Sequence, residues 1–171
     1  MWQDKGFIVS ETEIADAMQR LSSYLEEIPK AYLQFSSNDL LRKPGPGKWS
    51  KKEILGHLID SALNNLKRFT EIQFLPQPYI VQPYKQDELV AVNNYQQLEL
   101  EHLLRLWQAL NQQILDVVRN IPADKLGYPV HPQYGNNELQ SLKWIICDYV
   151  AHMEHHMKQI QAKFTGPQAS L

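Results

Sequence analysis

Four long stretches of helical periodicity, separated by proline-rich connections, constrain the fold of this chain more than any other feature. They cover residues 10–35, 50–74, 94–120 and 138–164, and in each one apolar residues recur every three or four positions. That spacing is typical of one buried stripe along a helix. No stretch alternates apolar and polar residues as a half-buried strand would. We therefore expect an all-α fold, a four-helix bundle.

Local signals refine the ends of the first two helices. Ser10 precedes Glu13 by three residues, and Ser50 precedes Glu53 by three. This is the spacing of a capping box, in which the serine and the glutamate satisfy each other's backbone N–H groups. Pro29 lacks a backbone donor, so we expect a kink or a break in the first helix at that residue.

The connection between the second and third helices is long for two neighbours in a bundle. It runs over residues 75–93 and contains Pro76, Pro78 and Pro83. Antiparallel neighbours need only about 2–8 connecting residues. A link of this length predicts a crossover that lets helices two and three run in the same direction. In the later irregular stretch, Val130 could lie in a short extended piece, but we expect no sheet.

Length and charge narrow the possible classes of protein. The 171 residues fit a single domain over 1–171. Seventeen basic against nineteen acidic side chains give a net charge of −2, so we expect no nucleic-acid partner. No apolar run approaches the ~18–20 residues that span a bilayer, so we expect no membrane partner.

The lack of a signal-peptide pattern and the single cysteine, Cys147, agree with a cytoplasmic protein. Cys147 lies in an apolar helical stretch, where we expect a buried, unreactive thiol.

Three of the six histidines crowd one turn of the last helix. His152 and His156 are four residues apart, so they lie on one helix face and can converge on one cation. Asp148 lies one turn earlier in the same row. His155 lies about 60° away and is expected to be exposed or to support a ligand from outside. Glu154 lies on another side of the helix, so it cannot serve as the general base of a His-Glu-x-x-His site.

A third ligand would have to come from elsewhere in the chain, because catalytic metal sites typically use three protein ligands. His57, His102 and His131 are available. Periodicity places His57 near the polar border of its helix, where an exposed histidine is the simpler interpretation. His102 lies among charged residues and His131 in a loop. Gly56 leaves backbone unshielded, which favours close packing or ligand approach. The residues alone leave metal binding and a structural role equally open.

Two motifs resemble a known family. Residues 46–50, PGKWS, and 53–60, EILGHLID, resemble the W-S … H-L-x-D signature of the DinB/YfiT-like superfamily. Residues 148–160 are similar to the closing H-x-x-x-H-x-x-Q-I element of that superfamily. Between them, Pro83-Tyr84, Asp87 and Asn94-Tyr95 also fit. The resemblance covers about residues 10–164, most of the chain.

The resemblance implies a four-helix bundle, often a homodimer, that binds one divalent transition metal through His57, His152 and His156. We expect zinc or nickel. Members of the superfamily include metal-dependent hydrolases and S-transferases that use low-molecular-weight thiols such as bacillithiol, mycothiol or glutathione. A metal held by neutral imidazoles keeps its full charge and acidifies a bound water or thiol, so either chemistry is possible.

Several residues could support such a site. Asp60, Asp148 and His155 could orient the ligand imidazoles, although a solvated charge is equally open for each carboxylate. Tyr84 and Gln82, in the long crossover, could cover a pocket for a small-molecule substrate. The alternatives to an enzyme are a non-catalytic metal-binding or interaction bundle, and a bundle that binds no metal.

Overall fold

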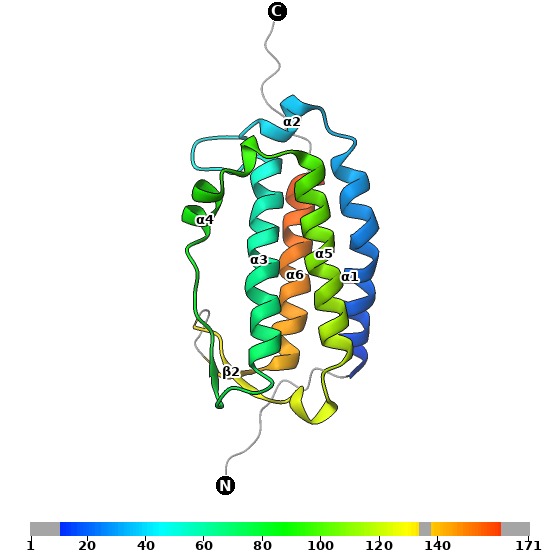
Figure 1. Cartoon of the computed structure of the whole chain (residues 1–171), viewed down its shortest axis with the longest axis vertical. Helices are drawn as coiled ribbons and strands as arrows, with labels where there is room; N and C mark the ends of the chain where they lie inside the picture. Colours follow the sequence, from blue (N-terminus) through cyan, green and yellow to red (C-terminus); the bar gives the residue numbers. More distant parts are fainter. Residues whose placement is uncertain (1–10, 134–137, 162–171) are drawn as a thin grey trace, which may run out of the picture.

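Four long helices form the body of the protein in the computed structural model, which describes residues 11–133 and 138–161. They are α1 (Glu11–Tyr32), α3 (Lys51–Glu71), α5 (Leu100–Arg119) and α6 (Leu142–Gln161). In Figure 1, α1 and α6 run in one direction and α3 and α5 in the other. Helix α3 packs against α5 and α6, and α1 packs against the same two helices. The predicted four-helix bundle, with parallel second and third long helices, is confirmed.

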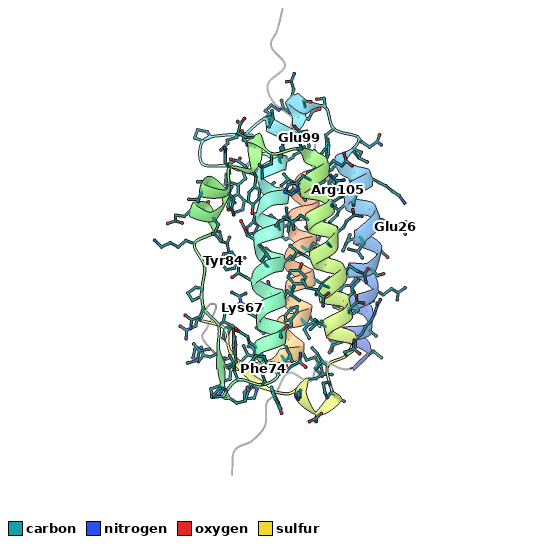
Figure 2. All side chains as sticks on the ribbon, viewed as in Figure 1. Glu26, Lys67, Phe74, Tyr84, Glu99 and Arg105 are labelled. Atoms are coloured by element: carbon teal, nitrogen blue, oxygen red, sulfur yellow. The ribbon has the colours of Figure 1, made fainter. Side chains whose placement is uncertain are left out.

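The core consists mainly of the apolar stripes of these four helices, and buried side chains of the connections, such as Val81 and Tyr95, join it. Large side chains with essentially no exposed surface come from each of them: Leu21, Ile28, Tyr32, Leu55, Leu58, Phe69, Leu103, Trp107, Ile114, Ile146 and Ile160. Each such side chain contributes about 1.5–3 kcal/mol relative to an exposed position. Charged side chains such as Glu26, Lys67 and Arg105 are exposed on the outer faces (Figure 2).

The helix starts and ends agree only partly with the predicted ones. Helix α3 begins with the expected capping box: the Glu53 N–H donates to Ser50 Oγ (3.2 Å), and the Ser50 N–H donates to the Glu53 carboxylate (2.8 Å). The predicted cap at Ser10 lies outside the described residues. Of the two outcomes expected at Pro29, a kink or a break, the break is wrong. Helix α1 continues to Tyr32, because the buried Ile28 and Tyr32 anchor it on both sides of the proline.

The crossover between α3 and α5 contains structure that periodicity did not predict. It includes β1 (Tyr79–Ile80), α4 (Gln86–Asn93) and the 3-10 turn η1 (Tyr95–Gln97), and it runs back along the length of α3 (Figure 1). Helix α5 therefore begins at Leu100 and not at residue 94. Asn94 takes a left-handed conformation, φ 50°, which ends α4 and separates it from η1.

A small sheet lies at the opposite end of α3 from its capping box. Strand β1 pairs in parallel with β2 (Pro129–His131), which pairs antiparallel with β3 (Gln140–Ser141). The expectation of no sheet is wrong, because strands of two or three residues are too short to show a period in the sequence. Pairing of β3 also delays the start of α6 to Leu142, and the predicted end of that helix at residue 164 lies outside the described residues.

Two further short helices complete the described chain. Helix α2 (Ser37–Leu41) follows α1 at the top of Figure 1, and the 3-10 turn η2 (Ala123–Lys125) follows α5. Because α3 and α6 are antiparallel neighbours, the beginning of α3 lies beside the end of α6. This arrangement brings the two histidine-bearing segments of the chain together.

Candidate metal centre

His57, His152 and His156 meet between the first turns of α3 and the last turns of α6. The Nε2 atom of His152 lies 3.2 Å from Nε2 of His57 and 3.1 Å from Nε2 of His156. Ligand atoms of all three side chains lie within 4.8 Å of one another. Nitrogens bound at about 2.0–2.1 Å to one tetrahedral zinc ion would lie about 3.3 Å apart. The three rings therefore have the spacing of a shared ion.

Hydrogen bonding alone does not account for this cluster. A neutral imidazole nitrogen either donates one proton or accepts through one lone pair. Nε2 of His152 has two imidazole nitrogens at hydrogen-bond distance, so it can satisfy only one of these contacts at a time. A cation placed among the three nitrogens would satisfy all of them at once. The donor set and its spacing thus fit a metal ion.

Burial keeps the three imidazoles neutral. It lowers the pKa of His57 to about 3 and that of His152 to about 4, and neighbouring imidazoles add to both decreases. Burial lowers the pKa of His156 as well. At neutral pH the rings therefore carry no charge, and each has a free lone pair for a metal, which is the form that binds metals.

Gln159 orients His156 and was not identified as a site residue from the sequence. Its side-chain oxygen lies 2.9 Å from Nδ1 of His156, and its nitrogen lies 3.0 Å from Nε2 of His155. Because a carbonyl oxygen only accepts, Nδ1 of His156 carries the proton and Nε2 presents its lone pair to the cluster. The signal for this role was the three-residue spacing from His156. His155 itself is exposed. Its ring centroid lies 5.3 Å from that of His156, and Gln159 also links the two side chains.

His57 is completely buried, which corrects the expectation of an exposed border position. Trp49, in the loop before α3, lies with its ring centroid 4.7 Å from that of His57, at an interplanar angle of 34°. The crossover covers another part of the same helix. A simple bundle would leave this face to solvent, but Trp49 and the crossover bury it.

Asp60 is a buried carboxylate and not a solvated charge. Its Oδ1 accepts hydrogen bonds from the Tyr95 hydroxyl (2.6 Å) and from the Asn93 side-chain amide (3.0 Å). Two buried atoms have no hydrogen-bond partner among the described residues: Oδ2 of Asp60, and Nδ1 of His57 one turn earlier on α3. Burial raises the pKa of Asp60, while the two hydrogen bonds oppose the increase. Asp60 thereby ties the crossover to the helix that carries His57.

Gly56 makes this attachment possible. A Cβ atom at residue 56 would lie 2.0 Å from Cδ2 and 2.2 Å from Cγ of the Tyr95 ring. The Tyr95 ring therefore packs directly on the backbone of α3, where no other residue type fits. The close packing expected at Gly56 is present, and its partner is the η1 turn.

The other sequence candidates lie apart from the cluster. His102 is exposed on α5, and His131 lies in β2 with its Nδ1 3.5 Å from the Gln133 amide nitrogen. Glu154 forms an ion pair with Arg20 of α1, so it faces away from the three histidines, as the helix geometry predicted. Cys147 is half-buried, and burial raises the pKa of its thiol, which disfavours a reactive thiolate.

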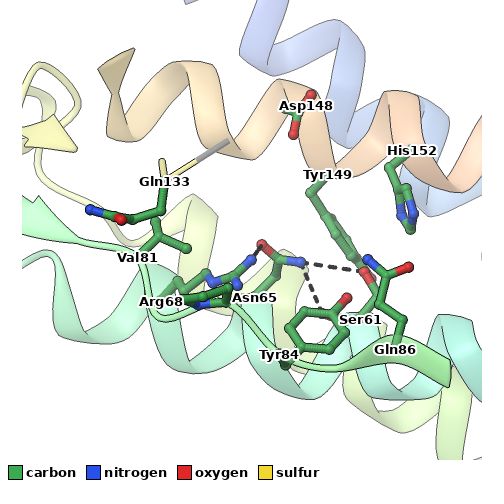
Figure 3. A pocket seen from close by; sticks show the side chains of 11 residues that line it. Ser61, Asn65, Arg68, Val81, Tyr84, Gln86, Gln133, Asp148, Tyr149 and His152 are labelled. Atoms are coloured by element: carbon green, nitrogen blue, oxygen red, sulfur yellow. Dashed lines mark hydrogen bonds between the residues drawn. The ribbon is translucent and has the colours of Figure 1, made fainter. Parts of the chain in front are cut away.

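Two hollows reach the histidine cluster. A cavity of about 350 Å³ ends at His152 and is lined by α3, α6 and the crossover (Figure 3). Tyr84 lines this cavity as expected, and Asp148 lines it too, but Gln82 is exposed and does not line it. A second hollow of about 520 Å³ reaches His156 from the side of Trp49 and Gln159. A cavity of a few hundred cubic ångströms suits a small molecule.

Fold and site together place the protein among four-helix bundles that gather three histidines in a metal-type cluster. The chain belongs to the DinB superfamily, whose family model matches residues 13–160. It is 20% identical over 153 residues to a relative from Halalkalibacterium halodurans, covering 90% of this chain and 87% of the relative. It is 24% identical over 141 residues to a relative from Oceanobacillus iheyensis, covering 80% and 79%. Both relatives are named "Putative metal-dependent hydrolase".

Two solved structures share the fold. YfiT from Bacillus subtilis, "a probable metal-dependent hydrolase with an unusual four-helix bundle topology", superposes with a TM-score of 0.80 at 19% identity, covering 89% of this chain and 86% of YfiT. A mutant of the mycothiol-dependent maleylpyruvate isomerase gives a TM-score of 0.69 at 10% identity, covering 88% and 61%. No helix within residues 11–133 and 138–161 is long and apolar enough to cross a membrane.

Proposed function

We propose that this protein is an enzyme that binds one divalent transition metal, zinc or nickel, through His57, His152 and His156. The bound ion would activate water or a low-molecular-weight thiol for reaction with a small molecule. The observation that carries the proposal is the convergence of three neutral imidazole nitrogens beside a cavity. A structural metal site is closed by four protein ligands, whereas a catalytic site keeps a position open. No fourth histidine, cysteine or carboxylate joins this cluster among the described residues.

The chain's own residues would each have a defined task in this enzyme. His57 and His152 present lone pairs from two different helices, and Gln159 fixes the tautomer of His156. Trp49 excludes water from one face of the His57 ring. The metal, when bound, would lower the pKa of a coordinated water or thiol and supply a nucleophile at neutral pH. Tyr84, on the crossover, would cover the substrate in the cavity.

Both reaction classes have support from relatives. The relatives named as hydrolases favour activation of water. The fold shared with a mycothiol-dependent isomerase favours a thiol as the second reactant. Thiolate is also a softer ligand than water, and zinc accepts soft sulfur ligands. We further propose a homodimer, which light scattering coupled to size-exclusion chromatography would test.

Metal content measured by inductively coupled plasma mass spectrometry on untagged protein tests the proposal. Wild type, after incubation with zinc or nickel and desalting, should retain about one equivalent, and His152→Ala should retain almost none. His102→Ala, an exposed histidine on α5 apart from the cluster, is the matched control and should keep its metal. Circular dichroism should show equal helix content in all three proteins. Wild type without metal would refute the assignment.

Reaction assays then separate an enzyme from a non-catalytic metal-binding protein. Loaded wild type should hydrolyse an ester or amide from a panel, or conjugate a thiol to an electrophile, and His152→Ala should not. A protein that holds one metal and catalyses neither reaction would be a binding or interaction bundle.

A further inference from the structure

The cavity beside the histidine cluster carries a cation at its far end. We propose that Arg68 binds a carboxylate of the small-molecule ligand whose reacting group lies at His57, His152 and His156. This inference rests on the proposed function and adds the chemical class of the ligand, a small organic acid. It also adds the direction in which that acid lies in the cavity.

A row of side chains on α3 runs along the cavity from the histidine cluster to Arg68. Ser61, Asn65 and Arg68 follow His57 on one side of the helix, at spacings of about one turn each, and all three line the cavity. Arg68 comes eleven residues after His57, which corresponds to about 16 Å along the axis at about 1.5 Å per residue. Side chains on a helix tilt toward its N-terminus, so Arg68 leans toward the cluster. In Figure 3, Tyr149 and His152 of α6 face this row from across the cavity.

Arg68 is held in place by neutral groups. Its Nη1 donates to Oδ1 of Asn65 (3.3 Å), and its Nη2 donates to the main-chain oxygen of Gln82 (3.1 Å). Its guanidinium carbon lies 5.6 Å from the centroid of the Tyr84 ring. Within the described part of the chain it forms no ion pair with a carboxylate. A guanidinium has five N–H donors in a planar fork that matches a carboxylate, so donors remain for a ligand.

The position of the cation sets the direction of the ligand. Arg68 lies at the end of the cavity away from His152 (Figure 3). Asp148, one turn before His152 on α6, lies between these two ends. Arg68 is the only lysine or arginine among the described residues that line the cavity. An acid would thus place its carboxylate at Arg68 and its uncharged, reacting end at the metal.

Paired thiol probes on cobalt-loaded protein test this inference directly. Cobalt(II) reports a bound thiolate by its charge-transfer absorption, so binding is read without an assay of activity. The probes are 6-mercaptohexanoate and the neutral 6-mercaptohexanol, with 3-mercaptopropionate and 11-mercaptoundecanoate as short and long acids. We expect 6-mercaptohexanoate to bind wild type about tenfold or more tightly than the alcohol, since a hydrogen bond to a charged group is worth at least that factor. Arg68→Met should remove the preference and leave cobalt content unchanged.

Lys67→Met is the matched control. Lys67 is the preceding residue on α3, carries the same charge, is exposed and forms an ion pair with Glu71. Its replacement should leave the preference for the acid as in wild type. Equal binding of the acid and the alcohol by wild type, or a preference that survives in Arg68→Met, would overturn the inference while leaving the metal site intact.

A second probe pair separates failure of the inference from failure of the proposed function. If neither thiol changes the cobalt spectrum, thiol activation is refuted. Binding of the carboxylate is then measured by calorimetry with hydroxamates in place of the cobalt spectrum. Suberic acid monohydroxamate should then bind about tenfold more tightly than octanohydroxamate, with the difference lost in Arg68→Met. No preference in this pair, or no binding of either member, would overturn the carboxylate site.

Discussion

Replacing Gly56 by alanine tests the packing that attaches the crossover to α3. The added Cβ would lie 2.0 Å from Cδ2 of Tyr95, far inside the contact distance of two carbon atoms. Tyr95 is only 5% exposed, so its ring has no solvent-filled space into which it can move freely. The ring must therefore leave α3, and its hydroxyl must then leave Asp60.

The expected cost follows from three contributions. Overpacking a filled site costs about 1–3 kcal/mol. Losing a hydrogen bond to a charged group costs about 1.5–3 kcal/mol. Alanine in a helix interior is favoured over glycine by about 0.8–1 kcal/mol, which offsets part of this loss. We expect Gly56→Ala to lower the free energy of unfolding by about 2–4 kcal/mol.

Urea denaturation followed by circular dichroism measures the change, and a second background tests its cause. In Tyr95→Ala the obstacle is absent, so adding Gly56→Ala should be neutral or should stabilise the protein by up to about 1 kcal/mol. Gly127→Ala, where a Cβ meets no atom within 4 Å, is the control and should change stability by less than about 0.5 kcal/mol. Stabilisation by Gly56→Ala alone would refute the reasoning.

Three further outcomes follow from the site and the core. Gln159→Ala should weaken zinc binding about 10–100-fold in a chelator competition, because the tautomer of His156 is no longer fixed. Replacing the exposed Lys158 by alanine should leave zinc binding unchanged. The metal-free protein should lose stability toward urea as pH falls from about 6.5 toward 3. The pKa of His57 is about 3 in the folded protein and ordinary in the unfolded chain, so over this range only the unfolded chain takes up the proton. Constant stability over that range would contradict this. Tyr149→Phe removes the buried hydroxyl that donates to Asn111 and should cost about 1–3 kcal/mol in urea denaturation.

The long helices and their directions could be predicted because they depend on properties that a linear sequence carries. A helix that buries one face leaves a period of three to four residues, and the length of the connection over residues 75–93 is a simple count. The small sheet could not be predicted in this way. Strands β1 and β3 have two residues each, and the pairing of β1 with β2 brings together segments about 50 residues apart in the chain.

The site could be predicted in part for the same reason. His152 and His156 are related by a local spacing, and periodicity is informative within one helix. The burial of His57 depends on Trp49 and on the crossover, which come from other parts of the chain. The periodicity of one helix indicates only the face that packs in the bundle, and it does not show which other faces the connections bury. The resemblance to a family supplied the pairing of His57 with the other two histidines.

The crossover separates part of the cavity lining from the helices that carry the histidine cluster. The histidines stand on α3 and α6, long helices whose positions are fixed by the core. Pro83, Tyr84 and Gln86 instead line the cavity from a part of the crossover that is not buried in that core. Substitutions there can alter the shape of the cavity while leaving the histidine cluster unchanged. Such an architecture allows the cavity to change in evolution without rebuilding the histidine cluster.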